Sequence, residues 1–191
     1  MKLILPALRI FFVLTLLTGV IYPLLMTGLG QLIFPLKANG SILSRDGKEI
    51  GSKLIAQKFT ADKYFWERPS AVDYNPLASG GSNLGPTSEA LRKLTHDREE
   101  ALRRGMNGAA SVPQDLIFAS GSGLDPELSP EGVRFQTERV AKARGLNPEQ
   151  TAQLEKLIDQ SILAPELGFI GEPRVNVLEL NLALDTMVSV R

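Results

Sequence analysis

The chain has 191 residues, with 21 basic and 21 acidic side chains, one histidine and no cysteine. From Lys37 onward the acidic residues outnumber the basic ones by two, and no basic cluster indicates a nucleic-acid surface. The lack of cysteine excludes disulfide frameworks, cysteine-based metal sites and thiol catalysis.

A long uncharged segment lies near the N-terminus. No charged residue occurs from residue 10 to residue 36, and at about 1.5 Å per residue a helix of this length reaches roughly 40 Å, enough to cross a hydrocarbon core of ~30 Å. A cleaved signal peptide is the alternative, but the run exceeds the roughly 7–15 apolar residues of such a peptide and no A-x-A-like site follows it. We therefore expect a transmembrane helix over residues 10–34.

Two basic residues, Lys2 and Arg9, precede this helix and no acidic residue accompanies them. Positive charge favours the cytoplasmic side, so residues 1–9 are expected in the cytoplasm and residues 35–191 in one extracytoplasmic, periplasmic domain. Small residues recur every four positions in the expected helix, a spacing that lets a partner helix approach closely, although glycine and proline are also simply common in membrane helices. These residues are Thr15, Gly19, Pro23 and Thr27.

The first half of the expected domain contains a hairpin, a long loop and a helix. Residues 41–58 place Asp46-Gly47 between short apolar stretches, which predicts a β-hairpin. Residues 64–86 are rich in Gly, Pro, Ser and Asn with interleaved aromatics, which indicates an ordered loop. A helix is expected to begin near Pro86 and to end at Gly105 and Gly108.

The second half is expected to alternate short strands and helices. Residues 116–118 suggest a strand, and Ser129-Pro130 begins a helix that ends at Gly145. Asn147 begins the next helix, with Gln150 placed to complete a capping box. Leucines alternate with other residues over 178–184, which predicts a final strand. The expected fold class is α+β, with one mixed domain after a single transmembrane helix.

Enzyme and metal signatures are missing. No serine has glycine two residues away on both sides, as a nucleophile elbow requires, and none is followed by lysine three residues later. The single histidine, His96, lies among charged residues on an expected exposed helix face. Without cysteine or a second histidine, a zinc site would need mostly carboxylates. We expect no catalytic residues and no metal site.

Two glycine-rich segments are the remaining candidate sites. Consecutive small residues expose backbone N–H groups that can bind anions, but the same residues also form tight turns against other backbone. These segments are therefore candidates for partner or nucleotide contact. They comprise Ser79, Gly80, Gly81, Ser82 and Asn83 in the first, and Ser120, Gly121, Ser122, Gly123 and Asp125 in the second.

Seven separated blocks, in one order along nearly the whole chain, resemble the C subunit family (KdpC) of the Kdp-type potassium-transporting ATPase. Any single block would be unspecific, but the ordered set is highly specific. The blocks are TGVIYPLL at 18–25, FP at 34–35 with ANGS at 38–41, YFWERPSA at 64–71, YNP at 74–76 with SGGSN at 79–83, ASGSGLD at 119–125, RVAKAR at 139–144 and NVLELNLALD at 176–185. One departure is Glu127, where many members of the family carry His.

The resemblance implies a non-catalytic subunit of a bacterial inner-membrane complex for potassium uptake. Its partners would be a channel-like subunit that carries potassium and a P-type ATPase subunit that hydrolyses ATP. The family is held to stabilise this assembly and is proposed to act as a catalytic chaperone that raises the affinity of the ATPase subunit for ATP. The complex, not this subunit, would handle ATP and potassium, with no tightly bound cofactor of its own. Because an outer domain cannot meet cytoplasmic ATP, we expect an outer cap whose effect on ATP passes through the complex. A membrane-tethered periplasmic enzyme is the alternative.

Overall fold

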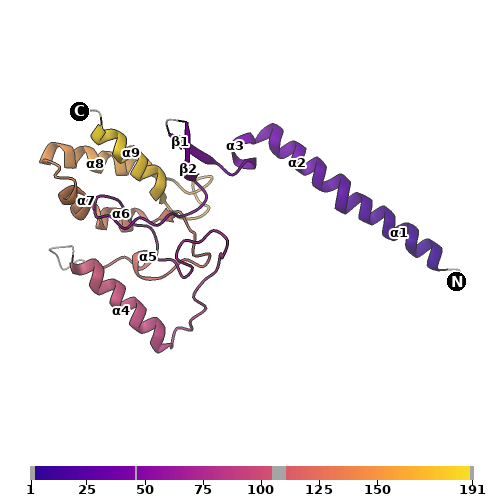
Figure 1. The fold of residues 1–191 in the computed structure, drawn as a ribbon, viewed down its shortest axis with the longest axis horizontal. Helices are drawn as coiled ribbons and strands as arrows, with labels where there is room; N and C mark the ends of the chain where they lie inside the picture. Colours follow the sequence, from indigo (N-terminus) through magenta and orange to yellow (C-terminus); the bar gives the residue numbers. More distant parts are fainter. Residues whose placement is uncertain (1–2, 46, 105–110, 190–191) are drawn as a thin grey trace. The chain divides into compact units, whose positions relative to one another are not determined.

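A computed structural model of the protein describes residues 3–45, 47–104 and 111–189. The chain forms two compact units, Met1–Ser52 and Lys53–Arg191 (Figure 1). The first unit contains the apolar helix and a hairpin, and the second contains the other helices and a small sheet. The expected mixture of helices and small sheets after one long apolar helix is confirmed.

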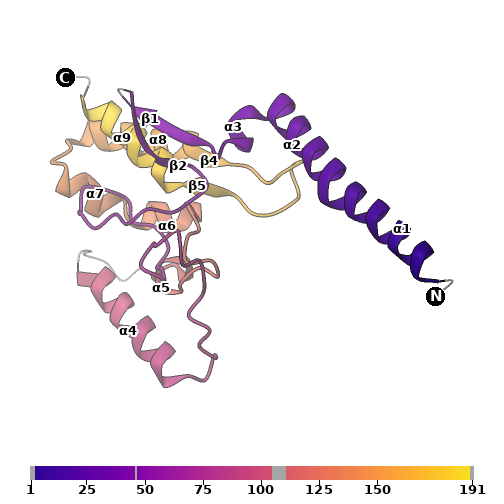
Figure 2. The ribbon, with the colours of Figure 1, turned by 45° about the vertical axis from the view of Figure 1, so that its right-hand side comes forward.

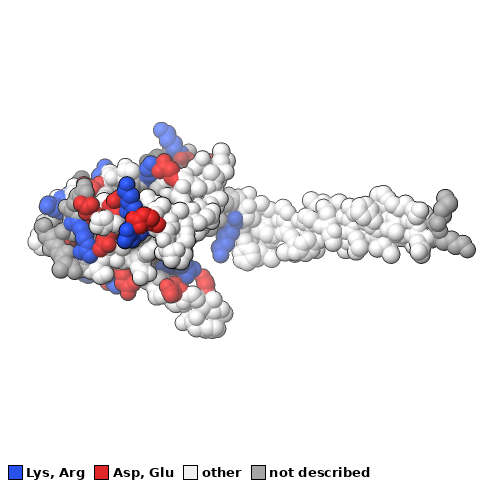
Figure 3. Space-filling model, turned by 90° about the horizontal axis from the view of Figure 1, so that it is seen from below, with Lys and Arg blue, Asp and Glu red and all other residues white. Residues whose placement is uncertain are grey.

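The apolar helix is continuous from Ile4 to Ile33, and an 18-residue window of it has a mean hydropathy of 2.2. It consists of α1 (Ile4–Leu16), the π-helical turn η1 (Leu17–Ile21) and α2 (Tyr22–Ile33). It begins earlier than the sequence suggested and includes Arg9. Its side chains are exposed in this unit, and much of its surface is uncharged in Figure 3. By length and composition it can cross a membrane.

The π-helical turn lies directly before Pro23. Proline has no N–H to donate and its ring crowds the preceding turn, so a helix containing it must loosen there. The turn also straightens the small-residue stripe. In a regular α-helix, two residues twelve positions apart point in directions that differ by about 120° around the helix axis. The π-turn accommodates one extra residue, so the side chains of Thr15 and Thr27 point only about 20° apart. That this stripe packs against a partner helix stays a prediction.

The expected hairpin is confirmed. After the short helix α3 (Pro35–Ala38), strand β1 (Ile42–Arg45) pairs antiparallel with β2 (Lys48–Ser52). Gly47 has a φ of +76°, which suits a tight reversal, and Asp46 lies outside the described residues. The Ser52 hydroxyl donates a 2.6 Å hydrogen bond to the Gly40 carbonyl and fixes the base of the hairpin.

The second unit contains a three-stranded antiparallel sheet with helices around it (Figures 1 and 2). The strand order is β3 (Glu127–Leu128), β5 (Arg174–Asn176) and β4 (Ile162–Leu163). The helices are α4 (Glu89–Arg104), α5 (Gln114–Ile117), α6 (Pro130–Phe135), α7 (Thr137–Ala143), α8 (Pro148–Ser161) and α9 (Val177–Ser189).

Two helix starts, those of α6 and α8, were correctly predicted from cap residues. The Ser129 hydroxyl accepts a 2.9 Å hydrogen bond from the Gly132 N–H at the start of α6. Asn147 and Gln150 form the reciprocal capping box of α8. Gly145, with a φ of +62°, follows the end of α7 as expected, but the predicted single helix is divided at Gln136 into α6 and α7.

Two strand predictions were wrong. The leucine-rich segment 178–184 belongs to helix α9, because the Asn176 side chain accepts from the Glu179 N–H and begins a helix. Its buried residues Val177, Leu180, Asn181 and Leu184 follow the i, i+3, i+4, i+7 spacing of one helix face, and Leu182 is only half-buried, so the alternating leucines do not define one side of a strand. Residues 114–117 form the short helix α5 after Pro113. Helix α4 begins at Glu89 rather than Pro86, and its predicted end at Gly105 and Gly108 lies outside the described residues.

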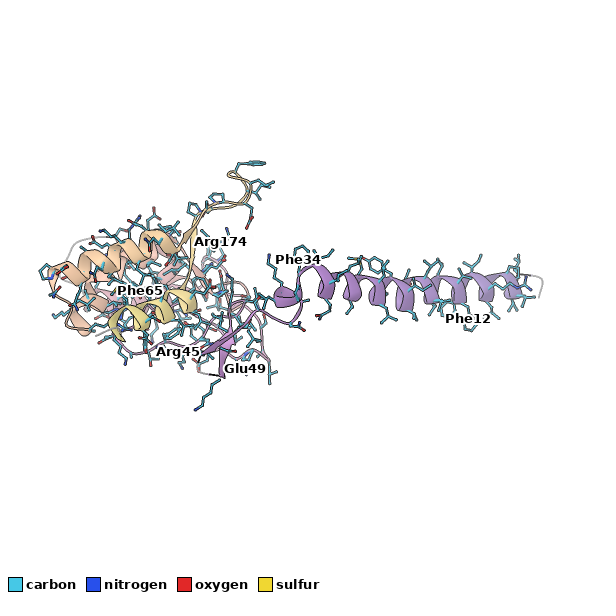
Figure 4. All side chains as sticks on the ribbon, turned by 90° about the horizontal axis from the view of Figure 1, so that it is seen from above. Phe12, Phe34, Arg45, Glu49, Phe65 and Arg174 are labelled. Atoms are coloured by element: carbon cyan, nitrogen blue, oxygen red, sulfur yellow. The ribbon has the colours of Figure 1, made fainter. Side chains whose placement is uncertain are left out.

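Phe65 is fully buried at the centre of the core, on an extended segment that two side-chain amides hold in place (Figure 4). The Asn181 amide accepts from the Phe65 N–H at 2.9 Å and donates to the Phe65 carbonyl at 2.9 Å. Gln136 does the same for Trp66, at 2.8 and 3.0 Å. We call these four bonds the amide clamp. It satisfies buried backbone groups that no strand pairs.

Arg139 adds a cationic support to the same segment. Its guanidinium lies 3.7 Å from the centre of the Trp66 ring and donates to the carbonyls of Asp62 and Tyr64. Burial lowers the pKa of Arg139 to about 10, so it remains charged at neutral pH. The RVAKAR block therefore supports the YFWERPSA block, which explains part of the pattern that made the sequence recognisable.

Candidate functional site: two paired glycine-rich loops

The two glycine-rich segments, far apart in sequence, contact each other. The Gly80 N–H donates a 2.8 Å hydrogen bond to the Ser122 carbonyl, and the Ser79 hydroxyl donates to the same oxygen at 3.1 Å. We call residues 79–83 the first loop and residues 120–125 the second loop. The sequence identified both but gave no indication that they pair.

Two glycines are required by this contact. A Cβ on Gly123 would lie 2.7 Å from Val72 Cγ2 and 2.8 Å from the Gly80 carbonyl oxygen, and its φ is +68°. A Cβ on Gly81 would lie 3.1 Å from the Gly121 carbonyl oxygen. Close backbone approach is thus the reason for glycine at both positions.

The other two glycines have room. A Cβ on Gly121 would meet nothing within 4 Å, and one on Gly80 only the Ala78 carbonyl at 4.0 Å. Gly121 is exposed, as are the neighbouring Ser122 and, in the first loop, Ser82 and Asn83. These residues form an outer surface on the paired loops.

Several backbone donors of the loops are already used inside the domain. The Ser120 N–H donates to the Pro69 carbonyl at 3.2 Å, and the Gly123 N–H donates to the Ser120 carbonyl at 3.2 Å. The Leu124 N–H donates to the Ser122 hydroxyl at 3.1 Å, and the Gly80 N–H is held by the pairing described above. A phosphate-binding nest needs successive N–H groups directed at the ligand, so this arrangement favours a structural pairing over a phosphate site.

An ion pair links the end of the second loop to an open hollow. Asp125 accepts from the Arg68 guanidinium at 2.9 Å and also accepts from the Glu127 N–H at 3.0 Å. The hollow beside them has a volume of about 530 Å³ and is lined mainly by charged residues, including Asp115, Glu131 and Arg174. Among the described residues, no cluster of three or more acidic or histidine side chains is arranged to hold a metal ion.

Glu67 is a buried carboxyl that sequence reasoning missed. It is only 5 % exposed, and neither carboxyl oxygen has a hydrogen-bond partner of good geometry among residues 3–45, 47–104 and 111–189. Burial, with a smaller contribution from the negative charge of Asp125, raises its pKa to about 8, although the Gln57 backbone opposes the shift. Burial, and after it the negative charge of ionised Glu67, raises the pKa of Tyr74 to about 12. No charge or spacing signal in the YFWERPSA block indicated a buried acid.

Replacing Glu67 with glutamine should stabilise the protein at neutral and alkaline pH. The folded pKa of Glu67 is about 8 and its ordinary value is 4.5, so folding favours the protonated form. Wild-type stability from this group is fully present below pH 4.5 and is lost as the pH rises towards 8. Glu67→Gln removes this dependence, and the free energy of unfolding at pH 8 should rise by a few kcal/mol.

The measurement is urea unfolding of the full-length subunit in detergent at pH 5, 6, 7 and 8. At pH 5 the variant and wild type should differ little, because pH 5 is close to the ordinary pKa of 4.5 and ionisation of Glu67 in the unfolded chain has only begun to lower the stability. The exposed Glu155→Gln on α8 is the matched control and should leave the pH profile unchanged. Parallel profiles for Glu67→Gln and wild type would show that Glu67 does not titrate in this range.

The remaining predicted residues do not join this site. His96 is exposed on α4, as expected from its charged neighbours. The stripe of Thr15, Gly19, Pro23 and Thr27 lies on the apolar helix, in the other unit. A Cβ on Gly19 would meet nothing within 4 Å in this chain. That the stripe packs against a partner helix stays a prediction.

Comparison with known proteins covers nearly the whole chain. Residues 4–186 match the family described as KdpC: K+-transporting ATPase, c chain. The chain is 54 % identical over 189 residues to the potassium-transporting ATPase KdpC subunit of Polaromonas naphthalenivorans, covering 97 % of this chain and 95 % of the relative. It is 54 % identical over 190 residues to that of Methylibium petroleiphilum, covering 97 % and 98 %. It is 51 % identical over 186 residues to that of Methylococcus capsulatus, covering 95 % and 96 %.

These full-length similarities are all to one subunit of a transport complex, so the alternative of a membrane-tethered enzyme is wrong. The long apolar helix lies inside the matched region, as expected of a membrane subunit. The chain belongs to the KdpC family, the non-catalytic subunits of the Kdp potassium-transporting ATPase complex.

Proposed function

We propose that the subunit caps the outer face of the complex in the bacterial inner membrane and stabilises the assembly of its other subunits. These are a channel-like subunit that carries potassium and a P-type ATPase subunit. The paired loops carry the proposal. They are an ordered, exposed surface of small polar residues, and internal hydrogen bonds hold them together at Ser122. Such a surface suits docking of a partner backbone.

The proposed orientation places the N-terminus in the cytoplasm and the domain in the periplasm. Lys2 and Arg9 precede or begin the apolar helix, and the first acidic residue of the chain is Asp46. The small-residue stripe supports contact with a partner helix within the bilayer, where close packing replaces the hydrophobic effect as the driving force.

The same orientation limits how the subunit can affect ATP. A periplasmic domain cannot touch a cytoplasmic nucleotide, and the loop N–H groups at Gly80, Ser120 and Gly123 are already bonded within the domain. We propose that any catalytic-chaperone effect, meaning a higher affinity of the ATPase subunit for ATP, passes through the assembled complex as a coupling between separate sites.

Protease accessibility tests this proposal. In spheroplasts, added protease should digest the domain of the full-length subunit, whereas in inverted vesicles the domain should be protected. An epitope tag at the N-terminus is the internal control, because it should show the opposite pattern. Digestion of the domain only in inverted vesicles would place it beside cytoplasmic ATP and would support direct nucleotide contact instead.

A further inference from the structure

The loop between β4 and β5 projects from the domain and carries large apolar side chains at its end. Leu167 is 82 % exposed, Phe169 is 78 % exposed and Ile170 is 52 % exposed. We call these three residues the apolar tip. Figure 4 shows the loop standing out from the body of the domain, with Arg174 at its base. A contiguous exposed apolar feature of this kind marks an interaction site more often than an ordinary surface.

The loop is held in one conformation by its own bonds. Glu166 and Ile170 exchange two backbone hydrogen bonds of 2.9 Å, and the Gly168 N–H donates to the Pro165 carbonyl at 3.0 Å. Leu167 has a φ of +53°, an uncommon conformation for a residue with a side chain. Leu167 therefore holds a strained backbone conformation that fixes the position of the tip. A tip fixed in this way is pre-organised for binding.

Charge around the tip argues against a lipid surface. Arg174 is the only basic residue from 164 to 174, and it is engaged by Glu166 and Glu127, each at 3.0 Å. Glu172 adds a second acidic residue to the loop. Segments that bind anionic bilayers combine apolar side chains with free Lys and Arg, the opposite of this composition. The complementary surface is an apolar pocket with a cationic or N–H-rich rim, which a protein can provide.

The tip is connected to the candidate site through a row of charged contacts. At the base of the loop, the Arg174 guanidinium forms an ion pair with Glu127, and the Glu127 N–H donates to Asp125. Asp125, at the end of the second loop, in turn forms an ion pair with Arg68. The tip and the paired loops therefore lie on the same unit and are joined by fixed contacts.

We propose that the apolar tip inserts into an apolar, cationically rimmed pocket on the outer face of another subunit of the complex. This rests on the proposed placement of the domain outside the cytoplasm. Tips with an aromatic anchor concentrate binding free energy in few residues, so Phe169 should act as the principal anchor. The surrounding acidic residues set the orientation rather than most of the affinity.

Paired substitutions at Phe169 test the anchor. Phe169→Asp should weaken retention of the subunit in the purified complex by about tenfold or more, as expected for loss of an aromatic hot spot, whereas Phe169→Leu should largely preserve it. Both variants should keep the melting temperature of the full-length subunit, since the side chain is exposed. Full retention of Phe169→Asp, or equal loss for both variants, would overturn the proposal.

The absence of cysteine permits a direct test of burial. Leu167→Cys places one thiol at the tip while keeping Phe169, and Gln153→Cys places one on the exposed face of α8. In spheroplasts a membrane-impermeant maleimide should label both variants when the subunit is expressed alone. With the other subunits present, labelling of Leu167→Cys should slow by roughly tenfold, as expected where a docked partner excludes water, and that of Gln153→Cys should not.

The outcomes separate the two proposals. Equal labelling of Leu167→Cys with and without partners would overturn docking of the tip. Slow labelling of Leu167→Cys in the subunit alone would place the tip in the bilayer and would also overturn docking on a protein.

If spheroplasts label neither variant and inverted vesicles label both, the outer placement fails. Protection by partners in those vesicles would then support docking at the inner face, and lack of protection would overturn it.

Discussion

Replacing Asn181 with leucine should lower the free energy of unfolding by about 4 kcal/mol, because the buried N–H and carbonyl of Phe65 would each lose their hydrogen-bond partner at a cost of about 1–3 kcal/mol. Both bonds of the Asn181 amide are 2.9 Å long, and the residue is 1 % exposed. Leucine has the same branching as asparagine but a larger volume, so the loss would come from missing polar groups and some overpacking rather than from a cavity.

Chemical denaturation of the full-length subunit in detergent measures this effect. Thr186→Leu is the matched control, since it makes a polar-to-leucine change on the exposed side of the same helix α9. It should alter stability by less than about 0.5 kcal/mol. A stable Asn181→Leu variant would mean that Phe65 and its neighbours have other partners, and that the amide clamp does not hold the core together.

Valine at Gly123 should destabilise the subunit far more than valine at Gly121, two residues away. At Gly123 the φ of +68° disfavours a β-branched residue, and the Cβ would lie 2.7 Å from Val72 and 2.8 Å from the Gly80 carbonyl. Strain and overpacking together should cost about 4 kcal/mol, a fall in melting temperature of about 10 °C. Gly121→Val should leave the melting temperature nearly unchanged, because nothing lies within 4 Å.

This contrast separates packing from function in the paired loops. Gly121→Val and Gly80→Val add bulk to the outer side without an internal clash, so they should reduce potassium-stimulated ATPase activity of the complex if that side docks on a partner. Normal activity with both variants would confine the loops to an internal, structural role. Similar melting temperatures for Gly121→Val and Gly123→Val would mean that the two loops do not pair as described.

The sequence predicted the features that depend on neighbouring residues. The apolar run specified the helix, Asp46-Gly47 specified the hairpin, and Asn147 with Gln150 specified the start of α8, because each signal is local. Helix α9 was mistaken for a strand because a short alternation of leucines also fits a helix. Leu180 and Leu184 lie on its buried face with Asn181, whereas Leu182 is only half-buried.

The site required information that is not local. Nothing in residues 79–83 or 120–125 indicates that Gly80 bonds to Ser122, since the pairing follows from the path of the whole chain. Burial of Glu67 was unpredictable for the same reason, because an acidic residue between Trp66 and Arg68 reads equally well as exposed. The apolar tip was overlooked because its short run of apolar residues resembles an ordinary buried segment.

The amide clamp also determines when this protein can finish folding. Phe65 depends on Asn181, which lies 116 residues later in the chain, so the centre of the core stays incomplete until that later segment has been synthesised. Contacts at such long separation form late and slowly. Helix α9 must leave the ribosome before residues 64–66 can reach their native position. Loss of α9 alone should therefore leave no stable remnant for quality-control proteases to spare.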